Sequence, residues 1–278
     1  MRRTFDNSPE FRRLLSGDEA VDLTRLSLEI AQDLYPDLDN AAYLIRLDAL
    51  AERVRDRCPS GAKVRQILGQ INWVLFVEES FRGNDESYYD PRNSFLNEVL
   101  DRKLGIPISL SVIYMAVADR LGLALSGVNL PAHFIVRSRW GSDAVFVDPY
   151  HGGTLMDRQG CQRLLEQVTG QGVELTDEQL APCSPVLVVR RMLHNLKAVY
   201  LRENDFVSAL PILRRLTALS GDDPIERRDL GVACLHADRP AEALDHLDAY
   251  LTAFPRAPDS VPVASLLKVA QREVASWN

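Results

Sequence analysis

The chain has 278 residues, of which 46% are hydrophobic and 26% are charged, so it can bury a sizeable core and is typical of neither a disordered nor a fibrous protein. Its formal net charge of -7 argues against nucleic acid as the main partner, because phosphate binding requires clustered lysine and arginine in excess. The four cysteines are scattered without the spacing of a zinc site, which indicates free thiols in a reducing compartment.

The distribution of apolar residues predicts no association with a membrane. No apolar run reaches the length of about 18 residues that spans a bilayer. Arg2 and Arg3 near the start are not followed by the apolar segment of a secretory signal. We therefore expect a cytoplasmic protein.

Residues 1–83 are predicted to form an N-terminal helical region that packs on the core. Apolar residues recur at helical spacing in four segments, and the breaks between the last three fall at Tyr35-Pro36 and Pro59-Ser60-Gly61. The segment Phe81–Ser94 is different, because it is polar and rich in turn residues yet includes Tyr88 and Tyr89. This segment is interpreted as an ordered loop packed on the body of the protein.

Ser94 is predicted to cap a short helix that follows this loop. Asn93 and Asn97 flank that helix start, and asparagine most often serves turns and caps. Each could instead supply an amide donor beside a site. The sequence leaves both interpretations open.

The next helix is predicted to be the centre of the fold. Pro107 favours an extended entry, and Ser109 is a suitable N-cap for the apolar run that follows it. Because this run is apolar on nearly every side up to Ala118, the helix should be buried. Ser109 would then lie where unpaired backbone N–H groups favour a nucleophile or an oxyanion, or it is simply a cap.

A small antiparallel sheet is predicted after Gly122. Residues 123–129, 133–137 and 144–148 have the short apolar or alternating pattern of strands, with a turn at residues 140–143. His133 begins one strand and Asp148 ends the next, so antiparallel pairing brings both to the same end of the hairpin. A helix over residues 157–168 completes a predicted core domain of residues 84–184.

Residues 185–278 contain an internal repeat with a period of 34 residues. A shift of 34 positions places Asn195–Leu201 on Asp229–Leu235, Ala209-Leu210 on Ala243-Leu244, and Pro224 on Pro258. This period resembles the tetratricopeptide repeat, in which pairs of helices stack on one another. Repeats of this kind indicate a protein or peptide partner, while the sequence indicates no particular oligomeric state.

Ser109, His133 and Asp148 follow the order in which papain-like and transglutaminase-like folds present nucleophile, base and orienting acid. Five segments extend this likeness, and together they resemble the SirB-type transglutaminase-like family. They are Phe81–Asn84, Tyr88–Asn97, Gly105–Ser111, Asn129–Phe134 and Val147–Pro149. The resemblance implies an α+β, mainly helical protein: a helical N-terminal region, a transglutaminase-like core with a small antiparallel sheet, and tetratricopeptide-like helical hairpins.

The resemblance implies that His133 and Asp148 match the base and the acid of that family. At the helix start, where active members carry cysteine, this sequence has Ser109, with Ser111 as a second choice. One hypothesis is a Ser-His-Asp hydrolase or acyltransferase acting on amide, ester or peptide bonds. The other hypothesis is a non-catalytic core in a protein that binds partners through its repeats. We favour it because a fold is often retained after its catalytic activity has been lost.

The remaining histidines are weaker candidates. His151 precedes Gly152-Gly153 and could line the same cleft, although a histidine in a turn is usually just solvated. His194, His236 and His246 belong to the repeat helices, where packing or surface roles are expected. Because no nucleotide-binding or metal-binding motif is present, we expect neither a cofactor nor a metal.

Overall fold

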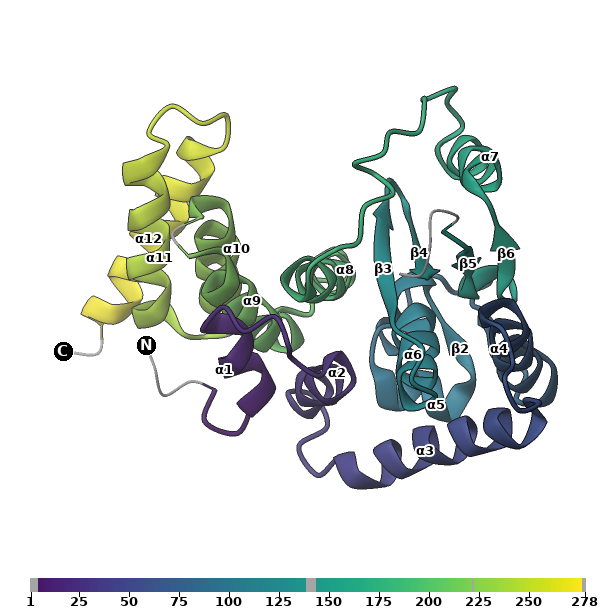
Figure 1. The fold of residues 1–278 in the computed structure, drawn as a ribbon. Coiled ribbons are helices and arrows are strands. Elements are labelled where there is room, and N and C mark those ends of the chain that lie inside the picture. Colours follow the sequence, from purple (N-terminus) through teal and green to yellow (C-terminus); the bar gives the residue numbers. More distant parts are fainter. Residues whose placement is uncertain (1–4, 139–143, 222, 277–278) are drawn as a thin grey trace. The chain divides into compact units, whose positions relative to one another are not determined.

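The computed structural model describes residues 5–138, 144–221 and 223–276, and it confirms the mainly helical α+β class (Figure 1). The chain divides into two compact units, residues 1–192 and residues 193–278. The division falls within helix α8 (Pro185–Glu203), which begins at the first residue of the segment that contains the sequence repeat. The turn expected at residues 140–143 lies outside the described residues.

The first unit opens with helices, as the apolar spacing predicts. Helix α4 is continued by a π-helical turn, η1, so that the helical segment ends at Glu78. These elements are α1 (Pro9–Leu15), α2 (Leu23–Gln32), α3 (Asn40–Arg57), α4 (Val64–Asn72) and η1 (Trp73–Glu78). Short strands β1 (Arg82–Gly83) and β2 (Leu104–Gly105) then pair in parallel on either side of the loop that contains Tyr88 and Tyr89.

The loop ends in the 3₁₀ turn η2 (Pro91–Asn93), and helix α5 (Leu96–Arg102) follows. The expected cap at Ser94 is wrong, since the residue before α5 is Phe95 and it makes no side-chain cap bond. Ser94 instead ends the preceding 3₁₀ turn, where its N–H donates to the carbonyl of Pro91 at 3.0 Å. Ser94 therefore belongs to the end of η2 and does not cap α5.

Helix α6 (Pro107–Arg120) is buried almost all round, as the apolar run predicts. Its start differs from the prediction, because Pro107 occupies the first turn and Ile106 is the capping residue. Proline is well suited to that position, since its fixed φ matches a helix and its missing N–H would be unpaired there anyway. Ser109 is consequently the third residue of the helix rather than its cap.

A four-stranded antiparallel sheet lies beside α6, in the order β3-β4-β5-β6. Its elements are β3 (Leu125–Leu130), β4 (His133–Ser138), β5 (Phe146–Asp148), the 3₁₀ turn η3 (Pro149–His151) and β6 (Thr154–Met156), after which helix α7 (Arg158–Thr169) follows. Phe134, Val136 and Val147 pack in the core that contains α6. Ile135 and Phe146, the alternate residues of the same strands, pack in a second core with Leu164 and Leu165 of α7. The sheet is therefore covered on both faces.

Replacing Tyr114 with phenylalanine is expected to lower the free energy of unfolding by about 1–2 kcal/mol, because a buried hydrogen-bond acceptor loses its partner. The Tyr114 hydroxyl, in α6, donates to Asn72 Oδ1 at 2.8 Å, and Asn72 Nδ2 donates to the Gly153 carbonyl at 2.6 Å. Urea unfolding measures the change. The control is Tyr43→Phe, whose hydroxyl bonds the exposed Asp101 and whose loss should cost less than about 0.5 kcal/mol. Equal losses in the two variants would contradict the prediction.

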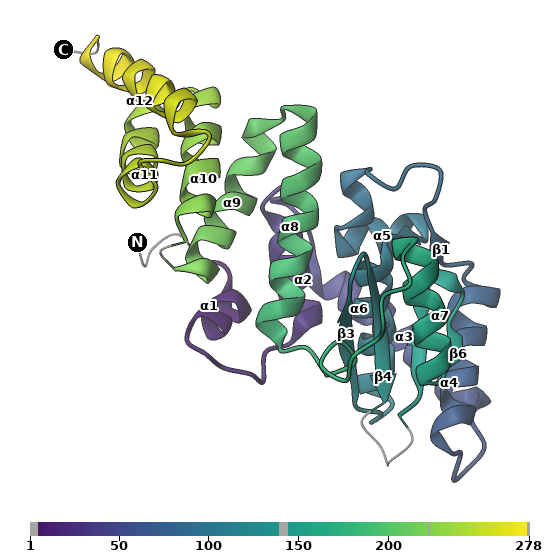
Figure 2. The ribbon, with the colours of Figure 1, turned by 90° about the horizontal axis from the view of Figure 1, so that it is seen from above.

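The second unit continues α8 as a succession of helices. They are α9 (Phe206–Ser220), α10 (Pro224–His236), α11 (Pro240–Ala253) and α12 (Ser260–Ala275). Each packs on the next, and Figure 2 shows α10, α11 and α12 side by side. Gly231 of α10 approaches α11 so closely that a Cβ atom there would lie 2.8 Å from Leu247 Cδ2. A larger residue at this helix crossing would require Leu247 to shift.

Within the described residues, none of the helices is both long enough and apolar enough to cross a membrane.

Candidate functional site

His133 and Asp148 meet at the end of the β4–β5 hairpin. His133 Nε2 lies 3.0 Å from Asp148 Oδ2, and both side chains are almost fully buried. Antiparallel pairing of β4 with β5 brings the first residue of one strand near the last residue of the next. The structure thus brings together two of the three site residues expected from the sequence.

His151 joins this pair, although a histidine in a turn was expected to be solvated. Its Nδ1 lies 2.7 Å from the same Asp148 Oδ2, and its ring stacks on that of His133 with the centroids 5.5 Å apart. The turn η3 places it there, because Asp148 caps that turn through Oδ1, which accepts from Tyr150 N at 3.0 Å and His151 N at 3.4 Å. A histidine three residues after an aspartate that precedes proline is the sequence signal that could have found it.

The charge of Asp148 is set by these contacts. Burial alone raises the pKa of a carboxyl group, but the hydrogen bonds and positive charge of His133 and then of His151 outweigh burial and hold the pKa of Asp148 below its ordinary value. Asp148 is therefore ionised at neutral pH. An ionised carboxylate accepts hydrogen bonds from both imidazole rings through one oxygen.

Ser109 has other partners. Its hydroxyl donates to the Asn93 carbonyl at 2.6 Å and accepts from Ile106 N at 3.0 Å. The side chain is buried, and Gly105 approaches it so closely that a Cβ atom there would lie 2.8 Å from Ser109 Oγ. Over the described part of the chain, no hydrogen bond joins Ser109 to His133.

His133 and Ser109 belong to two elements that pack on each other, β4 and α6. His133 pairs with Leu130 across the β3–β4 ladder and shares the strand parity of Ile135, and both of these apolar residues pack in the core with α7. Ser109 belongs to α6, which packs in the core on the other face. The His133 ring itself contacts the ring of Tyr150, which packs against the core that contains α6.

The sequence left the roles of Asn93, Asn97 and Ser111 open, and the structure gives them different environments. Asn93 holds the loop together, because its Nδ2 donates to the Ser87 carbonyl at 2.7 Å and its Oδ1 accepts from Asn84 Nδ2 at 3.0 Å. Asn97 Oδ1 and Ser111 Oγ are both buried without a hydrogen-bond partner among the described residues. Asn93 therefore serves loop structure.

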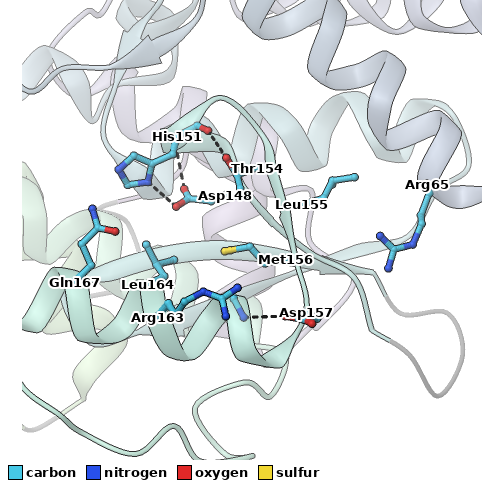
Figure 3. A pocket seen from close by; sticks show the side chains of 11 residues that line it. Arg65, Asp148, His151, Thr154, Leu155, Met156, Asp157, Arg163, Leu164 and Gln167 are labelled. Atoms are coloured by element: carbon cyan, nitrogen blue, oxygen red, sulfur yellow. Dashed lines mark hydrogen bonds and ion pairs between the residues drawn. The ribbon is translucent and has the colours of Figure 1, made fainter.

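A pocket of about 610 Å³ opens next to His151. Asp148 and His151 line one part of it, and Arg163 and Leu164 of α7 line another (Figure 3). The His151 side chain is 46% exposed, whereas the Asp148 side chain is 2% exposed. The cluster of His133, Asp148 and His151 is thus reachable from solvent on the His151 side.

The fold and the hairpin site define a transglutaminase-like core followed by tetratricopeptide repeats. Residues 41–194 match the family model of the transglutaminase-like superfamily, and residues 196–268 match that of the tetratricopeptide repeat. The chain belongs to the SirB-type transglutaminase-like family, whose bacterial relatives are named UPF0162 proteins.

Two bacterial relatives and one mammalian relative illustrate the range of the similarity. A UPF0162 protein of Xylella fastidiosa strain 9a5c is 35% identical over 244 residues, which cover 86% of each chain. A UPF0162 protein of Vibrio cholerae is 31% identical over 159 residues, 57% of this chain and 58% of the relative. F-box only protein 21 of Mus musculus is 33% identical over 146 residues, 50% of this chain and 22% of its own length. No solved structure gives a significant match.

Proposed function

We propose that this protein binds a protein or peptide partner through its tetratricopeptide repeats, and that its transglutaminase-like core has no acyl-transfer activity through Ser109. The observation that carries the second part is the environment of Ser109. A serine becomes a nucleophile only when a base in hydrogen-bond reach takes its proton. The Ser109 hydroxyl instead donates a hydrogen bond to the Asn93 carbonyl, which is not a base, and Ser109 is only 1% exposed. Both observations suit a structural role.

The repeat unit carries a cleft suited to a partner. It has a volume of about 400 Å³ and is lined by residues of α10, of α11 and of the segment that leads to α12. Ile225 and Phe254 are 47% and 42% exposed there, while Arg228 forms an ion pair with Asp259 at 2.7 Å. Exposed apolar side chains beside charged ones are typical of a surface that recognises a peptide.

A photo-crosslinking residue placed at Phe254 of the full chain tests this proposal in the cells that make the protein. We expect a discrete protein adduct, and we expect Ile225→Asp to reduce it at least tenfold. This substitution should leave folding intact, because an acidic residue is favourable in the first turn of α10. The matched control is the same probe at Val207, which is 70% exposed on α9 and does not line the cleft. Equal adducts from both positions would overturn the proposal.

The His133–Asp148 pair supports a second candidate function, hydrolysis or acyl transfer on amide, ester or peptide bonds. A base oriented by a buried carboxylate is what such chemistry requires. This candidate needs Ser109 to exchange its bonds to Asn93 and Ile106 for one to His133. Labelling of the intact protein by a serine-directed fluorophosphonate, lost in Ser109→Ala, would support it, and absence of labelling supports the binding role.

A further inference from the structure

Three side chains with metal-binding atoms converge on one point of the first unit. His133 Nε2 and His151 Nδ1 lie 3.0 Å and 2.7 Å from Asp148 Oδ2, and all three atoms lie within 4.8 Å of one another. They come from the start of β4, the end of β5 and the turn η3. Neither the repeats nor a serine mechanism accounts for the second histidine.

We propose that His133 Nε2, Asp148 Oδ2 and His151 Nδ1 bind a divalent first-row transition-metal ion such as Zn²⁺. Two imidazoles and one carboxylate form a donor set that such ions prefer, and three protein ligands leave positions open for water or another ligand. Magnesium and calcium prefer oxygen ligands instead. Metal binding uses the lone pair of each of these ring nitrogens, so a proton on that nitrogen moves to solvent or to the other nitrogen of the same ring.

The spacing of the donor atoms is compatible with one ion. With metal–ligand distances of about 2.1 Å, two ligands about 3 Å apart subtend roughly a right angle at the metal. The two histidine–aspartate distances, 3.0 Å and 2.7 Å, are therefore close to those of adjacent ligands on one face of an octahedron.

The surroundings orient the donor atoms. Asp148 Oδ1 is held by Tyr150 N and His151 N, which directs Oδ2 at both rings. The Tyr150 ring packs edge-on against His133 at 5.9 Å and against His151 at 5.2 Å. Outer contacts of this kind orient ligands and strengthen metal binding. The pocket beside His151 gives the ion a path from solvent.

Titration of the full chain with Co²⁺ and with Zn²⁺, after removal of metals by a chelator, tests the proposal. We expect one ion per chain by calorimetry, and visible absorption bands of bound Co²⁺ without the intense sulfur-to-metal bands that cysteine ligands give. His151→Ala should weaken binding at least tenfold, because it removes one of three ligands. The His151 side chain is 46% exposed, so this variant should fold; His151→Gln serves if it does not.

The matched control is His236→Ala, which removes an exposed histidine of the second unit. It should leave both stoichiometry and affinity unchanged. Absence of stoichiometric binding, or binding that His151→Ala leaves intact, would overturn the proposal. Either result leaves the proposed binding role of the repeats untouched, since that role depends on residues of the second unit alone.

Discussion

Replacing Asp148 with alanine is expected to lower the free energy of unfolding by about 3–5 kcal/mol at pH 7, the largest effect of any change at the site. The carboxylate accepts from His133, from His151 and from two backbone N–H groups, and its removal leaves the buried His133 ring without this partner. Asp148→Asn keeps one acceptor oxygen and should cost about 1–3 kcal/mol. Urea unfolding with a chelator present measures both, so that no bound metal contributes.

The control for this series is Asp157→Ala. Asp157 is exposed and caps α7 by accepting from Gly160 N at 2.8 Å, so its removal should cost about 1 kcal/mol. The pKa of Asp148 is lowered in the folded protein, so its stabilising effect is present at neutral pH and is lost as the pH falls below 3.8, the ordinary value, through the folded one. A loss for Asp148→Ala no larger than for Asp157→Ala would show that the cluster does not stabilise the hairpin.

The features that could be predicted from the sequence are those with a strong period. The 34-residue repeat predicts stacked helices, and the residues from 196 to 268 match the tetratricopeptide repeat. Strand alternation around His133 and Asp148 predicts a hairpin, and its pairing brings the two side chains together. The helical repeat and the hairpin could be predicted because the spacing of apolar residues along the chain indicates each of them.

The features that could not be predicted are local conformations for which the sequence allows two alternatives. Tertiary packing decides between them. Ser109 has the chemistry of a helix cap, but Pro107 begins the helix two residues earlier, and the hydroxyl then bonds back to Ile106 N. His151 belongs to a turn whose direction is set by Asp148, so its contact with that residue appears only in three dimensions.

Replacing Ser109 with alanine is expected to lower the free energy of unfolding by about 1–3 kcal/mol, because Ile106 N and the Asn93 carbonyl both lose a buried partner. Ser111 provides the matched control on the same helix. Its hydroxyl is buried without a hydrogen-bond partner among the described residues, so Ser111→Ala removes an unsatisfied polar group. This control should be neutral, or stabilising by up to about 1 kcal/mol. Urea unfolding of the two variants beside the parent chain measures the difference.

The sign of that difference separates two roles of Ser109. A hydroxyl that joins the helix start to the preceding loop must destabilise the protein when it is removed. Active-site groups held in strained or unsatisfied positions often have the opposite effect, since their removal relieves that cost. If Ser109→Ala is as stable as Ser111→Ala, Ser109 does not hold the helix start. If it is markedly less stable, the serine is a structural residue, and chemistry at this hairpin depends on the two histidines and the carboxylate they share.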